Sequence, residues 1–308
     1  MKKKSLISIL VFLILCLCGC TNPGPSSTFE IQFIDVGQGD SALVECDGHY
    51  MLIDGGDKKH GENVYKALEE NALGDKPVRH LDILAVSHFH EDHYAGLIKA
   101  LENVSEIDHA ISNTDSYKKG VGFDEDAEED PKKERSLFAD FTHELSESGA
   151  SLEVPHIDDE YPLGSAKVKV IYVSAKRNND SLVLLVTYGE TKFLFTGDIE
   201  DITQDDVRTQ IYKQYIKTGD EPYKINLIKA PHHGAYSGKL YNFYRTLEPE
   251  YVVISVGENS YGHPDQKTID LLSNPKSGYR PRKIFRTDEN GDIFVKSNGK
   301  IVTVEPSK

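Results

Sequence analysis

The chain has 308 residues, 38% of them hydrophobic, with 35 basic and 50 acidic side chains and a formal net charge of −15. This is the composition of an ordinary globular protein, long enough for one large domain or two smaller ones. The excess of acidic residues excludes nucleic-acid binding through a broad basic face. A polyanionic ligand would therefore have to be held by cations or by a local patch.

The first 28 residues differ from the rest. Residues 1–20 combine a basic start, an apolar run and small residues, which predicts a secretory signal. The tetrapeptide LCGC that ends at Cys20 resembles the bacterial lipobox, which implies cleavage before Cys20 and lipid attachment to it. A plain signal peptide or an uncleaved anchor helix remains the alternative. Residues 21–28 are a Pro/Gly/Ser tether, and residues 29–308 form the predicted domain.

Cysteine usage agrees with this organisation. Once the leader is removed and Cys20 is modified, Cys46 is the one cysteine left in the body of the chain. We therefore expect no disulfide partner within the domain, whose stability must come from its core. The expected location is the extracytoplasmic face of a bacterial membrane, through the lipid anchor.

The first half of the domain alternates strands and helices. Short apolar runs bounded by turn residues predict strands, and apolar spacing of three and four predicts helices. The expected order is strands 29–36, 41–46 and 50–54, helix 61–73, strand 81–86, helix 93–104 and strand 107–112. Residues 113–150 hold an acidic run at 124–130 followed by a helical stretch. We interpret them as a solvated surface insertion, with a lid over the site as the alternative.

The second half repeats this alternation. The expected order is strands 166–173, 181–188 and 191–198, helix 200–216, strand 225–230, a helix around 238–247, strand 251–257, helix 265–273 and a β-meander at 283–305. Asn-Gly pairs at 290–291 and 298–299 are typical of hairpin turns. Two such halves predict an α/β fold of two packed sheets with helices outside.

The segment SHFHEDH follows the apolar strand 81–86 directly. In an extended segment, residues two apart point the same way, so His88 and His90 can hold one ion. If a helix begins near Asp92, then Asp92 and His93 turn towards a neighbouring point. Two pairs of imidazole and carboxylate ligands suit a two-metal centre of zinc, manganese or iron.

The wider pattern points to a family. HFHEDH resembles the signature of the metallo-β-lactamase fold hydrolases. Together with FIDVGQGDSALVE, YMLIDGG, NNDSLVLLVTYGETKFLFTGD, IKAPHHGAYSG and NSYGHPD, it is similar to the extracytoplasmic domain of the ComEC competence proteins and their stand-alone relatives. Phosphorylcholine esterases share the TGD and PHHG blocks. The resemblance covers about residues 29–308 and implies a four-layer αββα sandwich.

The resemblance also implies roles for individual residues. His88 and His90 would hold metal one, Asp92 and His93 metal two, and Asp198 would bridge both ions. A carboxylate that follows glycine at the end of an apolar strand can bind two cations at once, which supports Asp198 independently.

The adjacent histidines of APHHG would divide two tasks. One completes metal two, and the other faces the substrate as a phosphate ligand or general acid. Neighbouring side chains on an extended segment point apart. We favour His233 as the ligand and His232 as the catalytic group, together with Asp92 and Asp198, and leave the reverse assignment open.

Metal one lacks a predicted third histidine. Many family members place it before the bridging aspartate, where this chain has RNNDS at 177–181. Asn178, Asn179, Asp180 or water could complete the site, and His156 is a further alternative. A weaker first site favours a harder ion such as Mn²⁺, or leaves one ion firmly bound.

Other positions would support the site. The resemblance implies that Asp54 orients a metal-bound histidine, and Asp40 either does the same or holds its turn. Packing at the start of a helix is the alternative for His263. Candidate contacts to the substrate are Asn179, Lys229, Tyr261 and His263.

These observations predict a metal-dependent hydrolase with two divalent ions, Zn²⁺ or Mn²⁺. The expected reaction is that of a phosphodiesterase or nuclease, in which a metal-bound hydroxide attacks extracellular DNA or a cell-wall phosphodiester of the teichoic-acid type. The alternatives are hydrolysis of a carbonyl substrate (a lactone, thioester or β-lactam) and a surface lipoprotein with a degenerate site. Nothing in the sequence sets the oligomeric state.

Overall fold

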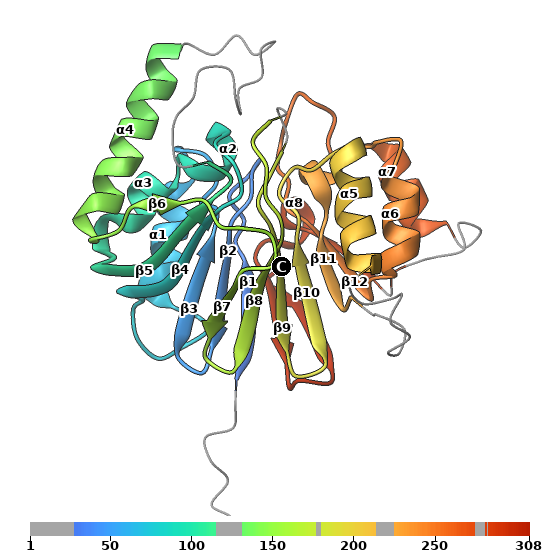
Figure 1. The fold of residues 1–308 in the computed structure, drawn as a ribbon, viewed down its shortest axis with the longest axis horizontal. Helices are drawn as coiled ribbons and strands as arrows, with labels where there is room; N and C mark the ends of the chain where they lie inside the picture. Colours follow the sequence, from blue (N-terminus) through green and yellow to red (C-terminus); the bar gives the residue numbers. More distant parts are fainter. Residues whose placement is uncertain (1–27, 115–130, 177–179, 214–224, 275–280, 282) are drawn as a thin grey trace, which may run out of the picture.

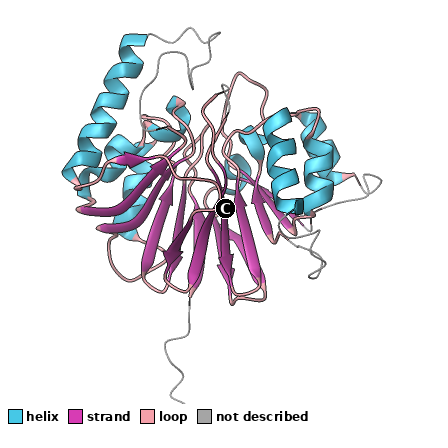
Figure 2. Ribbon diagram, viewed as in Figure 1, coloured by secondary structure: helices cyan, strands magenta, loops and turns pink. Residues whose placement is uncertain are grey.

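The structure, a computed structural model, describes residues 28–114, 131–176, 180–213, 225–274, 281 and 283–308. Two β-sheets face each other, and helices cover the outer face of each sheet (Figures 1 and 2). This arrangement confirms the predicted αββα sandwich. The predicted signal segment, all but one residue of the tether, the acidic run at 124–130 and Asn179 lie outside the described residues.

The first sheet has the strand order β15-β14-β1-β2-β3-β4-β5-β6. Its strands are β1 (Phe29–Phe33), β2 (Ala42–Cys46), β3 (His49–Ile53), β4 (His80–Val86), β5 (Glu106–Ser112), β6 (Leu152–Glu153), β14 (Ile293–Ser297) and β15 (Val302–Pro306). Pairing is antiparallel from β15 to β3 and parallel from β3 to β6. The parallel strands carry the helical connections, as parallel pairing requires.

The second sheet has the order β13-β12-β11-β10-β9-β8-β7. Its strands are β7 (Glu160–Leu163), β8 (Ala166–Tyr172), β9 (Val183–Tyr188), β10 (Thr191–Phe195), β11 (Leu227–Lys229), β12 (Tyr251–Ile254) and β13 (Lys283–Arg286). Pairing is antiparallel from β7 to β10 and parallel from β10 to β13. Each sheet thus changes from antiparallel to parallel pairing partway across.

The helices form the two outer layers. They are α1 (Gly61–Glu70), α2 (Glu91–Tyr94), α3 (Leu97–Ala100), α4 (Pro131–Glu147), α5 (Asp201–Ile211), α6 (Leu240–Leu247), α7 (Gln266–Ser273) and α8 (Thr287–Asn290), with 3₁₀ turns η1 (Leu101–Asn103) and η3 (Pro231–Gly234). Figure 1 shows α1, α3 and α4 outside the first sheet and α5, α6 and α7 outside the second. Leu137 and Phe141 of α4 are buried in the core beneath that layer. The interpretation of 113–150 as a solvated insertion is therefore wrong for α4.

The alternation of side chains along the strands creates three apolar layers. In β2, Ala42 and Val44 point into the core between the sheets, whereas Leu43 points into the core beneath α1, α3 and α4. A third core lies between the second sheet and α5, α6 and α7. Both faces of each sheet are therefore covered, which explains the nearly continuous apolar strands.

The helix predicted at 93–104 is broken into α2, α3 and η1. An uninterrupted helix would bond the Gly96 N–H to the Asp92 carbonyl. Here the Asp92 carbonyl accepts the N–H of Asp40 at 3.2 Å, and the Gly96 N–H donates to the Gly56 carbonyl at 2.9 Å. A Cβ atom at Gly96 would lie 2.0 Å from the Gly55 carbonyl oxygen. Backbone contacts with distant turns therefore replace the helical bonds.

The β-meander predicted at 283–305 is also wrong in part. β13 pairs in parallel with β12 in the second sheet, whereas β14 and β15 pair with each other and with β1 in the first. The Asn-Gly pair at 298–299 lies between β14 and β15, as expected, but the pair at 290–291 ends α8. The chain crosses between the sheets at a point where its local sequence is typical of a hairpin.

Candidate metal centre

The histidine-rich segment lies where β4 ends and α2 begins. The backbone of His90 is extended and α2 begins at Glu91, so the predicted change from extended to helical geometry falls inside the motif. The rings of His88 and His90 lie 4.3 Å apart. Phe89, between them in sequence, is buried and packs against Tyr94 at 5.3 Å between ring centroids. The apolar side chain thus anchors the segment while the two imidazoles lie side by side.

Asp198 lies at the centre of a histidine cluster. Its Oδ2 atom is 3.2 Å from Nε2 of His93 and 3.4 Å from Nε2 of His233. The same oxygen is 3.8 Å from Nε2 of both His88 and His232. The loops after β4, β10 and β11, which belong to both sheets, therefore meet at one carboxylate.

Asp198 is ionised and rigidly held. Burial by itself raises the pKa of its carboxyl, but the surrounding imidazoles, first that of His233, outweigh burial and hold the pKa well below its usual range. The Asp198 N–H donates to Oγ of Ser181 at 3.0 Å. The preceding Gly197 has a φ of +53°, and a Cβ atom there would lie 2.6 Å from Ser181 Oγ. Only glycine allows this approach.

The donor atoms fit divalent cations. Nε2 of His88, His93 and His233 and Oδ1 of Asp198 are buried, and none has a hydrogen-bond partner within the described part of the chain. Burying such atoms without partners is costly, and a bound cation removes that cost. Two groups of ligand atoms share Asp198, each within 4.8 Å: His88, His90 and Asp198, and Asp40, His93, Asp198 and His233. Imidazole and carboxylate donors of this kind suit transition-metal ions.

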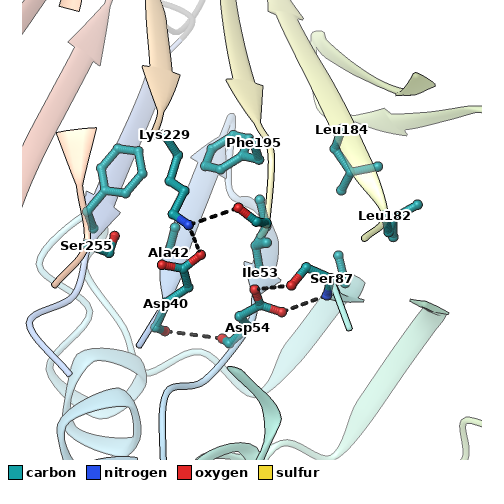
Figure 3. A pocket seen from close by; sticks show the side chains of 14 residues that line it. Asp40, Ala42, Ile53, Asp54, Ser87, Leu182, Leu184, Phe195, Lys229 and Ser255 are labelled. Carbon is teal, nitrogen blue, oxygen red and sulfur yellow. Dashed lines mark hydrogen bonds and ion pairs between the residues drawn. The ribbon is translucent and has the colours of Figure 1, made fainter. Parts of the chain in front are cut away.

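The Nδ1 atoms fix the orientation of two of these imidazoles. Nδ1 of His93 lies 2.9 Å from Oδ2 of Asp54, and Nδ1 of His233 lies 2.9 Å from the Ser255 carbonyl oxygen. Both contacts place the ring proton on Nδ1 and leave Nε2 as the lone-pair donor. The N–H and Oγ of Ser87 donate to the two oxygens of Asp54 at 2.7 Å (Figure 3). Asp54 therefore lies where the predicted orienting role requires it.

A buried ion pair that the sequence did not reveal lies beside the bridging carboxylate. Lys229 Nζ contacts Oδ2 of Asp40 and donates to the Gly197 carbonyl at 3.2 Å (Figure 3). The same nitrogen lies 3.7 Å from Oδ1 of Asp198. Burial by itself lowers the pKa of Lys229, but these two carboxylates outweigh it and hold the pKa above the usual value. The side chain is 4% exposed, so the prediction that Lys229 contacts a substrate phosphate is wrong.

Asp40 and Asp92 approach the same two imidazoles from different sides. Asp40 lies 3.2 Å from Nδ1 of His233 and 3.7 Å from Nδ1 of His93. Asp92 lies 3.2 Å from Nε2 of His233 and 3.9 Å from Nε2 of His93. The Nε2 side also faces Asp198. Asp40 therefore lies on the Nδ1 side of the two rings and Asp92 on the Nε2 side, although the group of ligand atoms within 4.8 Å contains Asp40 and not Asp92.

His232 lies at the outer edge of the cluster. Its ring is partly exposed, whereas His233 is buried. The prediction assumed an extended segment, but the two residues have φ of 44° and 48° within η3. Nδ1 of His232 lies 2.5 Å from Oε1 of Glu200, and its ring lies 5.0 Å from that of His263. Glu200 was missed, although it stands two positions after Asp198.

Two alternatives for the third ligand of metal one, Asp180 and His156, are not among the grouped ligand atoms of the described residues. The carboxylate of Asp180 accepts bonds from Oγ of Ser174 at 2.5 Å and Oγ1 of Thr203 at 2.8 Å, so it braces its own loop. The His156 side chain is 92% exposed and lies outside the buried cluster. Residues 177–179, which include Asn178 and Asn179, lie outside the described ranges.

The fold and this cluster define the class of protein. The chain belongs to the metallo-beta-lactamase superfamily, whose family model matches residues 34–255. As a member of that superfamily with this ligand cluster, it is a metal-dependent hydrolase. The metallo-beta-lactamase fold protein YhfI from Bacillus subtilis shares the fold, with a TM-score of 0.53 at 9% identity over 88% of this chain and 100% of that chain.

Two curated proteins are similar to this chain in sequence. The chain is 26% identical over 315 residues to ComE operon protein 3 of Bacillus subtilis (strain 168), covering 96% of this chain and 36% of that protein. It is 24% identical over 278 residues to Recombination protein 2 of Haemophilus influenzae (strain ATCC 51907 / DSM 11121 / KW20 / Rd), covering 88% of this chain and 29% of that protein. The chain thus spans about a third of the length of these relatives.

Proposed function

We propose that the chain is a metal-dependent phosphodiesterase that cleaves DNA outside the cell. The observation that carries this proposal is the sharing of Asp198 by two ligand groups, one with His88 and His90 and the other with His93 and His233. When bound, divalent cations in such a site lower the pKa of water and act as Lewis acids towards phosphoryl oxygens. Zn²⁺ and Mn²⁺ both suit these donors.

The residues of the chain have separable tasks in this reaction. The Nε2 atoms of His93 and His233, oriented by the Nδ1 contacts of the same rings, would hold a divalent cation. Glu200 holds Nδ1 of His232 at 2.5 Å, so that Nε2 points towards the Asp198 side of the site. His232 is therefore placed to donate a proton or a hydrogen bond to the leaving oxygen.

DNA is the substrate that the similarities favour. The name Recombination protein 2 and the resemblance to competence proteins both point to DNA, although this chain covers only about a third of each relative. A cell-wall phosphodiester of the teichoic-acid type presents the same scissile group. The convergence of buried imidazoles on Asp198 counts against a degenerate site, because such atoms are costly to keep without a ligand.

The test combines metal analysis with cleavage. The full chain, purified in mild detergent, should hold one to two divalent ions and cleave linear single-stranded DNA with Mn²⁺ or Zn²⁺, and EDTA should stop the reaction. Asp198→Asn should remove the activity, whereas His156→Ala, which alters an exposed histidine outside the cluster, should retain it. Metal-loaded protein that cleaves neither DNA nor a simple phosphodiester with either ion would refute the proposal.

The location is a separate proposal. Within the described ranges, no helix combines the length and the apolar character needed to cross a membrane. We propose from the sequence that lipid attached to Cys20 holds residues 29–308 at the extracytoplasmic face of the membrane. Cys20→Ser should abolish incorporation of labelled palmitate and release the chain into the soluble fraction. Unchanged labelling would contradict the proposal.

A further inference from the structure

The loop after β12 exposes an aromatic ring near the metal centre. Tyr261 is 73% exposed, the highest value among the large hydrophobic residues that the structure describes. A tyrosine ring has a large apolar face and a polar tip, so an exposed one can be covered by a ligand at the mouth of a site.

A ladder of rings connects Tyr261 to the cluster. Its ring lies 6.0 Å from that of His263 with an angle of 24° between the planes. The ring of His263 lies 5.0 Å from that of His232, and Nε2 of His232 is 3.8 Å from Oδ2 of Asp198. Two ring-to-ring steps therefore separate the exposed ring from the imidazole at the edge of the site.

The loop that carries Tyr261 and His263 is braced by hydrogen bonds. The Asn259 side chain donates to the carbonyls of Gly257 and His263, both at 2.8 Å, and its Oδ1 accepts the His263 N–H at 3.0 Å. The N–H of Asp265 donates to the Gly234 carbonyl at 3.1 Å, which fastens the loop to η3. A ring on a braced loop loses little conformational entropy when a ligand stacks on it.

The geometry points to a stacking platform, formed by Tyr261 and His263, for a nucleobase next to the phosphate that is cleaved. This inference rests on the proposed function and adds a subsite to it. With a net charge of −15, the chain cannot gain much affinity by neutralising phosphates along a strand. Stacking on an aromatic side chain contributes affinity for single-stranded nucleic acid without a basic face and tolerates any base.

A trimethylammonium group is the other chemistry that an exposed tyrosine could bind. Its recognition uses aromatic faces arranged around the cation as a cage. Tyr261 and His263 are instead nearly parallel, at 24°. The ring of His232 stands at 67° to that of His263, but its nitrogens face Glu200 and Asp198, so it belongs to the metal centre and not to a cage wall. The observations therefore favour a planar base over a choline-type head group.

Binding measured without catalysis tests the platform. The full chain, treated with EDTA, is titrated into a short single-stranded oligonucleotide that carries one 2-aminopurine, whose fluorescence is quenched by stacking. Tyr261→Ala should abolish the quenching and weaken binding about 5- to 150-fold, whereas Tyr261→Phe should retain both. Tyr241→Ala, on α6 outside the second sheet, is the matched control for loss of an exposed tyrosine (Figure 1) and should bind as the wild type does.

Each other outcome has a clear meaning. Equal binding and quenching by wild type and Tyr261→Ala would overturn the inference. Binding of phosphocholine that depends on Tyr261, with no binding of the oligonucleotide, would overturn it as well. If quenching depends on Tyr261 but the metal-loaded chain cleaves no phosphodiester, the platform stands and the proposed hydrolysis fails. If cleavage occurs, an abasic residue beside the scissile phosphate should slow the wild type but not Tyr261→Ala.

Discussion

Replacing Lys229 by methionine tests whether the buried ion pair supports the metal centre. Methionine retains most of the volume of the side chain but removes its charge, so the packing around β11 is largely kept. The change leaves the Asp40 carboxylate buried without the ammonium group that contacts it, and removes the bond to the Gly197 carbonyl. Breaking a buried ion pair by removing one partner costs about 3–5 kcal/mol. We expect the free energy of unfolding of Lys229→Met to be lower than that of the wild type by an amount in that range.

The assay must separate this loss from metal binding. Unfolding in urea is followed by circular dichroism, because the chain has no tryptophan whose fluorescence could report it. EDTA is present because any bound cation would itself stabilise the folded state. Adding Zn²⁺ should then restore more stability to Lys229→Met than to the wild type, since a cation beside Asp198 compensates part of the charge that Lys229 supplied from 3.7 Å.

The double variant provides the control. In Lys229→Met/Asp40→Asn neither charge of the pair is present, so the stability should recover to within about 2 kcal/mol of the wild type. Asp40→Asn alone should be destabilised, because it leaves the ammonium group of Lys229 facing a neutral amide. A Lys229→Met variant within about 1 kcal/mol of the wild type in EDTA would refute the reasoning, and so would a double variant as unstable as the sum of the single changes.

Three further predictions follow from local geometry. Gly39→Ala should be at least about 2 kcal/mol less stable than Gly149→Ala. Both positions have positive φ, but a Cβ atom at Gly39 would lie 2.3 Å from the Asp92 carbonyl oxygen, whereas one at Gly149 would meet no atom within 4 Å. Equal losses of stability in urea unfolding would contradict this prediction. Cys46 is buried, and burial raises the pKa of its thiol, so peptide mass spectrometry should find it alkylated slowly by iodoacetamide in the native chain and rapidly in urea. His93→Ala should lower the bound metal measured by mass spectrometry by about one ion per chain, and an unchanged metal content would remove this histidine from the ligand set.

Much of the fold could be predicted because its signals are local. The apolar run 81–86 and the alternation in 41–46 reflect side-chain burial one strand at a time, and the structure has β4 and β2 there. The segment from His88 to His93 could be placed at a strand end from the sequence, because the change from extended to helical geometry depends on consecutive residues.

Other features depend on residues far apart in the chain. The break between α2 and α3 comes from backbone bonds to Asp40 and Gly56, and the transfer of β13 to the second sheet comes from pairing with β12. No local pattern encodes either partner.

The features of the site also fall into those that the sequence determines and those that depend on tertiary packing. The sequence by itself determined which residue types are present and that imidazoles and carboxylates end several strands. Only the tertiary structure decided that Asp40 meets the Nδ1 side of His93 and His233 while Asp198 meets their Nε2 side, and that Lys229 turns inward to a carboxylate. The physical reason is that a charge can be buried only where a partner from another segment compensates it, and that partner is fixed by the packing of the two sheets.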